Sequence, residues 1–134
     1  MSSMAHAVVQ AVENMTAAFQ RSDLDGVMTA YERPAAIAFE PGQAVCDEDR
    51  IREMFAQWFA LEPRFEYAGH DVLVAGDLAL HVAPWRMRGT VPGGEPVERE
   101  GLSIAVLRRA PSGGWRIVID NPHGQRLLTP AEAR

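Results

Sequence analysis

The chain has 134 residues, of which 47% are hydrophobic and 23% charged, a composition typical of one soluble domain. Its net charge of −5, without a concentrated basic stripe, argues against DNA or RNA as a partner. No apolar run approaches the roughly 20 residues that span a bilayer, and the first residues lack the basic and apolar pattern of a secretory signal. We therefore expect a cytoplasmic protein that is not bound to a membrane.

The sequence contains no lysine, which excludes Schiff-base chemistry and covalent attachment of pyridoxal phosphate. The single cysteine, Cys46, excludes an intrachain disulfide and any site with several cysteine ligands, and we expect it to pack inside the protein. His70, His81 and His123 do not recur at zinc-ligand spacing. These residues lead us to expect neither a metal nor a cofactor.

Three helices are predicted in the first half of the chain. Apolar residues recur every three or four positions from Met4 to Arg21, which is the pattern of an amphipathic helix. Asp23 caps a second helix, which the same spacing extends from Leu24 to Tyr31. A third helix begins near Asp47 and ends before Pro63, with an apolar stripe of Ile51, Met54, Phe55, Trp58 and Phe59.

The remaining segments are predicted to be strands joined by turns. Pro34 ends the helical run, and two short strands follow at Ala35–Glu40 and Gln43–Val45. Turn residues then separate four longer segments, which are Phe65–Ala75, Leu78–Arg88, Val97–Arg109 and Trp115–Asn121. Helices followed by a meander predict an α+β domain, spanning residues 1–134, with helices packed on an antiparallel sheet.

The alternation of side chains between the two faces of the last strand indicates which residues face an internal pocket. Trp115, Ile117 and Ile119 share one parity, so they are expected to face the core. A regular pleat carries Asn121 inward with them. Asp120 has the opposite parity and points inward only if a bulge interrupts the strand.

The strand Leu78–Arg88 is partly apolar on both faces. Helices that cover one side of the sheet and a second subunit that covers the other side produce such a pattern. We therefore expect a homodimer that forms through the outer face of the sheet.

Several segments resemble the ketosteroid-isomerase-like superfamily, which is also called nuclear transport factor 2-like or cystatin-like. Three segments of the first half are similar to bacterial ketosteroid isomerases, namely Ser22–Val27, Ala35–Gly42 and Ile51–Phe55. Three segments of the second half are similar to SnoaL-like members, namely Val74–Leu80, Val106–Arg109 and Gly114–Ile117. The resemblance implies three helices on a strongly curved sheet, which forms a cone-shaped half-barrel around an apolar pocket. It does not imply one reaction, because the superfamily includes isomerases, cyclases, hydrolases and non-catalytic binding modules.

The isomerase chemistry of this superfamily uses a carboxylate base, a tyrosine and a protonated aspartic acid. By resemblance, Glu40 falls at the position of the base. Met15 falls where the tyrosine is expected, and a thioether cannot donate a hydrogen bond. The second donor falls near Ser103 or Ile104, neither of which is an acid. Losing one such hydrogen-bond donor typically lowers the reaction rate by about 10²- to 10³-fold, so the full isomerase mechanism requires other residues that donate in place of the missing ones.

Glu40, His81 and Asn121 are the catalytic candidates, since His81 or Asn121 could replace a missing donor. Each also has a structural interpretation: Glu40 as a solvated carboxylate at a strand end, and His81 as a core histidine bonded to backbone. Residues expected to contact an apolar small-molecule ligand are Met15, Tyr31, Phe55, Phe59, Trp85, Met87, Ser103, Ile119 and His123.

Two functional hypotheses remain open at this point. The first is a cofactor-independent isomerase, cyclase or hydrolase that acts on an apolar substrate with Glu40 as general base. The second is a non-catalytic ligand-binding, dimerisation or accessory domain, which the missing donors favour.

Overall fold

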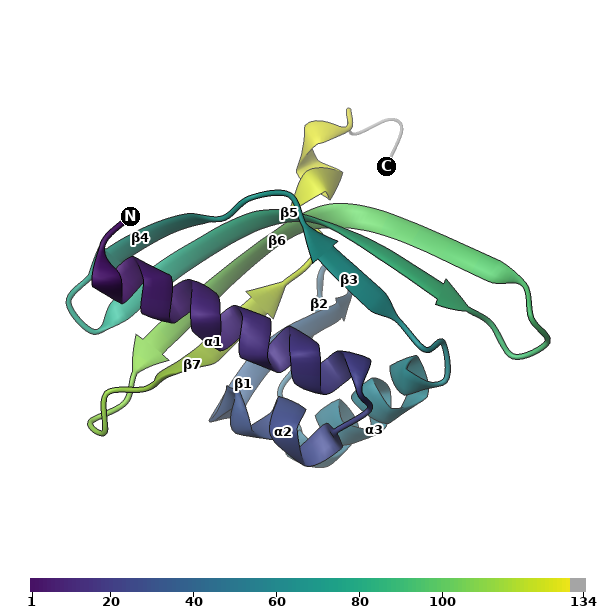
Figure 1. Cartoon of the computed structure of the whole chain (residues 1–134), viewed down its shortest axis with the longest axis horizontal. Helices are drawn as coiled ribbons and strands as arrows, with labels where there is room; N and C mark the ends of the chain where they lie inside the picture. The colour runs from purple at the N-terminus through teal and green to yellow at the C-terminus, as the bar shows by residue number, and fades with distance from the viewer. Residues whose placement is uncertain (131–134) are drawn as a thin grey trace.

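The computed structural model describes residues 1–130 (Figure 1). The helices are α1 (Ser3–Gln20), α2 (Leu24–Thr29), α3 (Glu48–Phe59) and a short 3-10 helix, η1 (Gly124–Leu128). The strands are β1 (Tyr31–Glu40), β2 (Gln43–Val45), β3 (Arg64–Tyr67), β4 (Asp71–Ala75), β5 (Leu78–Thr90), β6 (Pro96–Arg109) and β7 (Trp115–Asn121). The α+β prediction is confirmed. Within residues 1–130, no helix combines the length and the apolarity needed to cross a membrane.

Side-chain caps fix where each of the three α-helices begins. The Ser2 hydroxyl oxygen accepts a hydrogen bond from the Ala5 N–H at 3.1 Å and starts α1. The Asp23 carboxylate accepts from the Gly26 N–H at 3.0 Å, which confirms its predicted role as the cap of α2. Asp47 caps α3 in the same way, since its side chain accepts two backbone N–H groups of the first turn.

The seven strands form one sheet in the order β2-β1-β7-β6-β5-β3, and β4 also pairs with β5. All pairs are antiparallel except β1 with β7, which is parallel. The segment predicted as one strand, Phe65–Ala75, is two strands, because the chain leaves the sheet at Ala68–His70 before it pairs again. Consequently β3 and β4 lie along different halves of the long strand β5.

The predicted end of the second helix and start of the next strand are wrong. Tyr31 begins β1 instead of ending α2, because the Ala30 carbonyl accepts a hydrogen bond from the Ile117 N–H at 2.9 Å and draws the chain into the sheet. Pro34 lies within β1, at an irregularity in its pairing with β7. Such a position suits proline, which has no N–H to donate to the ladder.

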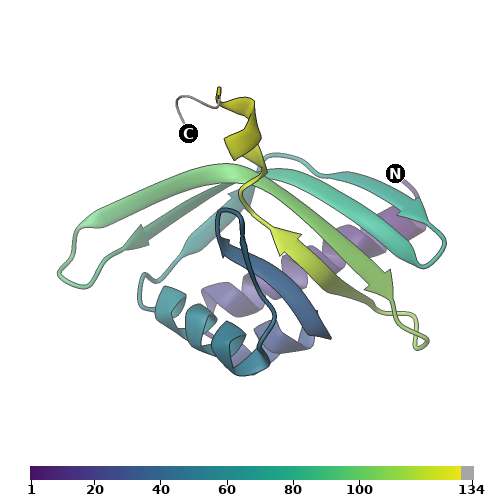
Figure 2. The ribbon, with the colours of Figure 1, turned by 180° about the vertical axis from the view of Figure 1, so that it is seen from behind.

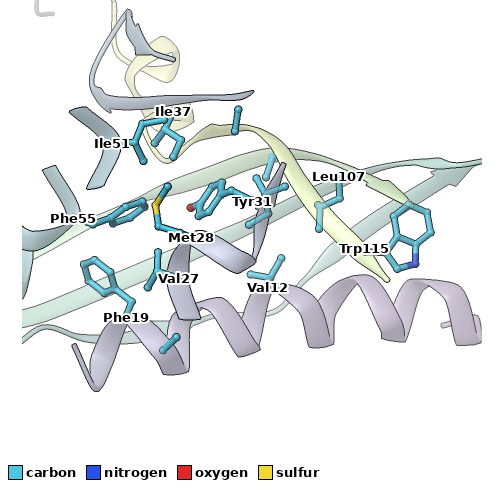
Figure 3. Packing of buried hydrophobic residues seen from close by; sticks show 14 of the residues in the cluster. Val12, Phe19, Val27, Met28, Tyr31, Ile37, Ile51, Phe55, Leu107 and Trp115 are labelled. Atoms are coloured by element: carbon cyan, nitrogen blue, oxygen red, sulfur yellow. The ribbon is translucent and has the colours of Figure 1, made fainter. Parts of the chain in front are cut away.

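The helices α1, α2 and α3 lie against one face of the curved sheet, and η1 lies on the opposite side (Figures 1 and 2). We call the helix-covered face concave and the other face convex. Apolar side chains from the helices and the concave face form the core, with Phe19, Tyr31, Phe55, Leu107 and Trp115 among them (Figure 3). Cys46 is exposed, so the expectation that it packs inside is wrong.

Candidate functional site

A cavity of about 130 Å³ lies between α1, α3 and the concave face of the sheet. Its walls are mainly apolar and aromatic, with side chains such as Met15, Phe55 and Met87. Besides Trp85, seven residues of the lining carry polar side-chain groups: Thr16, Tyr31, Tyr67, His81, Ser103, Asp120 and His123. An apolar cavity with a few polar groups is the usual form of a small-molecule site.

A β-bulge turns Asp120 toward this cavity. In the pairing of β6 with β7, Leu107 opposes Ile117 but Val106 opposes Ile119, so Val118 is an extra residue. The bulge reverses the parity of every later residue in the strand. Asp120 therefore joins the concave face, whereas the side chain of Ile119 lies on the convex face.

Asp120 is held by Tyr31. The Tyr31 hydroxyl donates a hydrogen bond to Oδ2 of Asp120 at 2.6 Å, a length typical of a strong bond to a carboxylate. Burial raises the pKa of Asp120 above its ordinary value of 3.8, although the Tyr31 hydrogen bond and the charge of His123 act in the opposite direction. Burial and the adjacent Asp120 raise the pKa of Tyr31, so Tyr31 stays protonated as the donor.

A second tyrosine is bonded to a helix across the cavity. The Thr16 hydroxyl donates to the Val12 carbonyl at 3.0 Å, which leaves its oxygen free to accept. The Tyr67 hydroxyl lies 2.9 Å from Thr16 Oγ1 and is therefore the donor of that bond. Burial is the main cause that raises the pKa of Tyr67 to about 12, so the phenol stays neutral.

His81 is fully buried on β5, with 0% of its surface exposed. Its Nε2 lies 2.8 Å from Nδ1 of His70, and Nε2 of His70 lies 3.6 Å from the Glu13 carboxylate. Burial and the neighbouring His70 lower the pKa of His81 to about 4, so its imidazole is neutral at pH 7. Nδ1 of His81 has no hydrogen-bond partner within residues 1–130.

His123 and Trp85 define the end of the cavity where β7 finishes. Nε2 of His123 donates to the Phe39 carbonyl at 3.2 Å, and the Trp85 indole donates to the Pro122 carbonyl at 3.0 Å. Gly101, opposite Trp85 on β6, makes room for this indole, since a Cβ there would lie 2.7 Å from the Trp85 ring. These contacts hold both polar side chains in place without a ligand.

Most of the predicted site residues line the cavity, but some do not. The cavity residues among them are Met15, Tyr31, Phe55, His81, Trp85, Met87, Ser103 and His123. Phe59 lies outside the lining and packs its ring edge-on against Phe19, with centroids 5.3 Å apart. Ile119 is 48% exposed on the convex face because of the Val118 bulge, so its expected inward orientation is wrong.

The structure does not bring the three catalytic candidates together. Glu40 is exposed at the end of β1 and lies outside the cavity lining. Asn121 opposes Ile104 on the convex face, and its side-chain oxygen accepts the His123 N–H at 3.0 Å. The expected inward orientation of Asn121 is therefore wrong, for the same reason as that of Ile119. His81 alone of the three lines the cavity.

Three polar residues of the cavity were not among the candidates: Thr16, Tyr67 and Asp120. A signal for Asp120 exists in the sequence, because Ile117, Val118 and Ile119 are consecutive apolar residues that break the alternation just before it. Thr16 and Tyr67 carry no comparable signal, since their bond joins residues 51 positions apart.

The arrangement suits acid–base chemistry in an apolar space. Asp120 has a second oxygen, Oδ1, for which residues 1–130 supply no hydrogen bond, so it is available to a ligand. A carboxyl whose pKa is raised by burial holds a proton more readily than an exposed one, which suits a group that both accepts and donates a proton. Among residues 1–130, no group of three His, Cys, Asp or Glu side chains is placed to hold a metal ion.

Comparisons with known proteins agree with this architecture. A model of the SnoaL-like domain matches residues 12–116. A search of curated proteins found no significant match. Among solved structures, a protein of the nuclear transport factor 2-like family from Streptomyces avermitilis is 18% identical, with a TM-score of 0.77 over 86% of this chain and 91% of that chain.

Two further solved structures share the fold. A ketosteroid isomerase-like protein from Erwinia carotovora atroseptica is 18% identical, with a TM-score of 0.74 over 90% of this chain and 95% of its own. The association domain of CaMKII from C. elegans is 17% identical, with a TM-score of 0.67 over 84% of this chain and 89% of its own. Such identities establish the fold, and the family model spans most of the sequence. The chain belongs to the SnoaL-like domain family.

Proposed function

We propose that the protein is a cofactor-independent enzyme that performs acid–base chemistry on a small apolar molecule bearing a carbonyl group. The observation that carries the proposal is the Asp120 carboxyl, bonded to Tyr31 at 2.6 Å in a mainly apolar cavity. Asp120 thereby takes the role that the sequence suggested for Glu40. The reaction type within isomerases, cyclases and hydrolases is set by the substrate.

The proposed chemistry begins with proton transfer at a carbon next to the carbonyl. Tyr31 fixes one oxygen of Asp120, which lines the cavity, and leaves the other oxygen, Oδ1, free to act on a ligand. The ionised carboxylate removes the proton and the resulting acid returns it elsewhere on the substrate. Removal of water by the apolar walls strengthens each of these electrostatic interactions.

The test is hydrogen–deuterium exchange next to the carbonyl of cyclohexanone, a probe of suitable size, followed by proton NMR in D₂O. We expect exchange that the protein accelerates and that Asp120→Asn slows by about 10² to 10⁴-fold, the usual contribution of a general base. Glu40→Gln is the matched control, since Glu40 is exposed outside the cavity, and it should leave the exchange rate unchanged.

The alternative function is a binding domain without catalysis. Binding of cyclohexanone that shifts resonances of cavity residues, without any accelerated exchange for it or for larger ketones and enones, would support this alternative. Exchange that depends on Glu40 and not on Asp120 would contradict the assignment of the base.

We also infer that two copies of the chain associate through the convex face. Leu73 is 63% exposed there and Ile119 is 48% exposed. Neighbouring positions in β5 and β6 add half-buried apolar side chains, namely Leu80, Val82, Leu102, Ile104 and Val106. A continuous apolar patch of this kind is unusual on a monomer, and one self-complementary patch suffices for a symmetric dimer. The fold is used for association in the CaMKII domain named above.

A further inference from the structure

His81, one of the polar residues that line the cavity, is connected to the protein surface through His70 and Glu13. Nε2 of His81 and Nδ1 of His70 are 2.8 Å apart, and His70 Nε2 is 3.6 Å from Oε1 of Glu13. The His70 side chain is 17% exposed and that of Glu13 is 51% exposed. This His81–His70–Glu13 chain therefore runs from a buried cavity wall to solvent.

The order of the three groups, His81, His70 and Glu13, determines which nitrogen of each ring carries hydrogen. A carboxylate only accepts, so the nearby Glu13 favours a hydrogen on Nε2 of His70. With that hydrogen on Nε2, the His70 ring has its acceptor lone pair on Nδ1, which accepts from Nε2–H of His81 at 2.8 Å. His81, neutral in turn, has its lone pair on Nδ1.

That lone pair has no partner within residues 1–130, although the atom is buried. Buried acceptors are normally hydrogen-bonded, and an unpaired one costs free energy. His81 lines the cavity. Because the atom is buried, a donor group of a ligand in the cavity reaches it when a neighbouring side chain shifts.

The sheet places His81 and Asp120 on either side of one small residue. His81 opposes Ala105, and Ala105 opposes Asp120, so the three form one row across β5, β6 and β7 on the concave face. Two strand spacings put the backbones of His81 and Asp120 roughly 10 Å apart. The methyl group of Ala105 leaves the space between them open to a ligand that contacts both.

We propose that Nδ1 of His81 accepts a hydrogen bond from a hydroxyl or N–H group of the substrate, and that the His70–Glu13 pair fixes His81 in the form that accepts. This inference rests on the proposed function and narrows its substrate class. The substrate is an apolar molecule that carries a hydrogen-bond donor at His81 in addition to the carbonyl group that reacts at Asp120. His81 thereby selects among ligands of similar shape.

The test compares phenol with toluene, two probes of nearly equal size that differ in the hydroxyl group. A cavity of about 150 Å³ is known to hold benzene, and the cavity found here, at about 130 Å³, is of similar size. In ¹⁵N NMR of the histidine-labelled protein at pH 7, we expect His81 to be protonated at Nε2 and not at Nδ1. Phenol should shift the Nδ1 resonance toward that of a hydrogen-bonded nitrogen, and toluene should leave it in place.

Variants outside the cavity separate this role from simple packing. Glu13→Gln keeps the shape of the side chain but removes its charge, and His70→Phe removes the partner of His81. Both should lower the affinity for phenol by about three- to tenfold and leave the affinity for toluene unchanged, since one hydrogen bond is weakened. Glu53→Gln, an exposed carboxylate on α3, is the control and should affect neither probe.

The outcomes distinguish this inference from the proposed function. Two results would overturn the role of His81 and leave the cavity as a ligand site. In the first, both probes bind in the cavity while phenol leaves the Nδ1 resonance unmoved. In the second, Glu13→Gln and His70→Phe leave the preference for phenol intact. If neither probe binds, the proposed ligand site itself fails and the inference fails with it.

Discussion

Replacing Tyr31 with Phe removes the hydroxyl that donates to Asp120 and leaves the buried ring in place. Tyr31 is 3% exposed and its bond to Oδ2 is 2.6 Å long. A hydrogen bond to a charged group is worth about 1.5–3 kcal/mol, whereas one between neutral groups is worth about 0.5–1.5 kcal/mol. Tyr31→Phe should therefore lower the free energy of unfolding by about 1.5–3 kcal/mol when Asp120 is ionised, and by less when it is protonated.

The direction of this pH dependence follows from the Asp120 carboxyl. Loss of the Tyr31 donor removes an interaction that favours the ionised form, so the pKa of Asp120 rises further in the variant. The destabilisation caused by Tyr31→Phe is small at pH values at which Asp120 is protonated in both proteins. It grows as the pH rises through the pKa of Asp120 in the folded protein.

Urea unfolding of the wild type and the variant, repeated from acidic to neutral pH, measures this difference. Tyr67→Phe is the matched control, because the Tyr67 hydroxyl is bonded to the neutral Thr16 hydroxyl at 2.9 Å. Its cost should be about 0.5–1.5 kcal/mol and nearly independent of pH. Equal and pH-independent losses in the two variants would refute the proposed coupling of Tyr31 to an ionised Asp120.

Three further predictions concern Asp120, Gly101 and the convex face. Because burial raises the pKa of Asp120, this residue contributes its full stabilisation below pH 3.8 and loses it as the pH rises through the raised pKa. The Asp120→Asn variant should therefore be more stable than the wild type at neutral pH in the same urea series. Gly101→Ala should displace the Trp85 indole, seen as a red-shifted tryptophan fluorescence and weaker binding of toluene. Leu73→Glu should shift a dimer to a monomer in analytical ultracentrifugation, whereas Asp49→Asn, at an exposed position of α3, should not. An unchanged sedimentation coefficient of the Leu73→Glu variant would contradict the convex interface.

The fold could be predicted from the sequence because its signals are local. The helix period of Ser3–Gln20, the cap at Asp23 and the turns between the later strands each depend on neighbouring residues. Errors arose where long-range pairing prevailed over local preference. Tyr31 continues a helical spacing in the sequence, yet pairing with Ile117 places it in the sheet.

The candidate site was predicted less well, because one extra residue in a strand reverses its faces. Val118 turned two nominated residues, Ile119 and Asn121, to the convex face and brought Asp120 into the cavity. The apolar lining was less sensitive, since large side chains on α1, α3 and β5 enclose the same space whatever the register of β7. Contacts such as that of Thr16 with Tyr67 depend on tertiary packing, which periodicity does not encode.

A crystal structure of the protein with cyclohexanone bound shows whether Asp120 is the base. We expect the ring to lie in the cavity above Ala105, with a carbon next to the carbonyl about 3–3.5 Å from Oδ1 of Asp120, the separation needed for proton transfer. A ketone that binds beside Glu40 while the cavity stays empty would contradict this expectation.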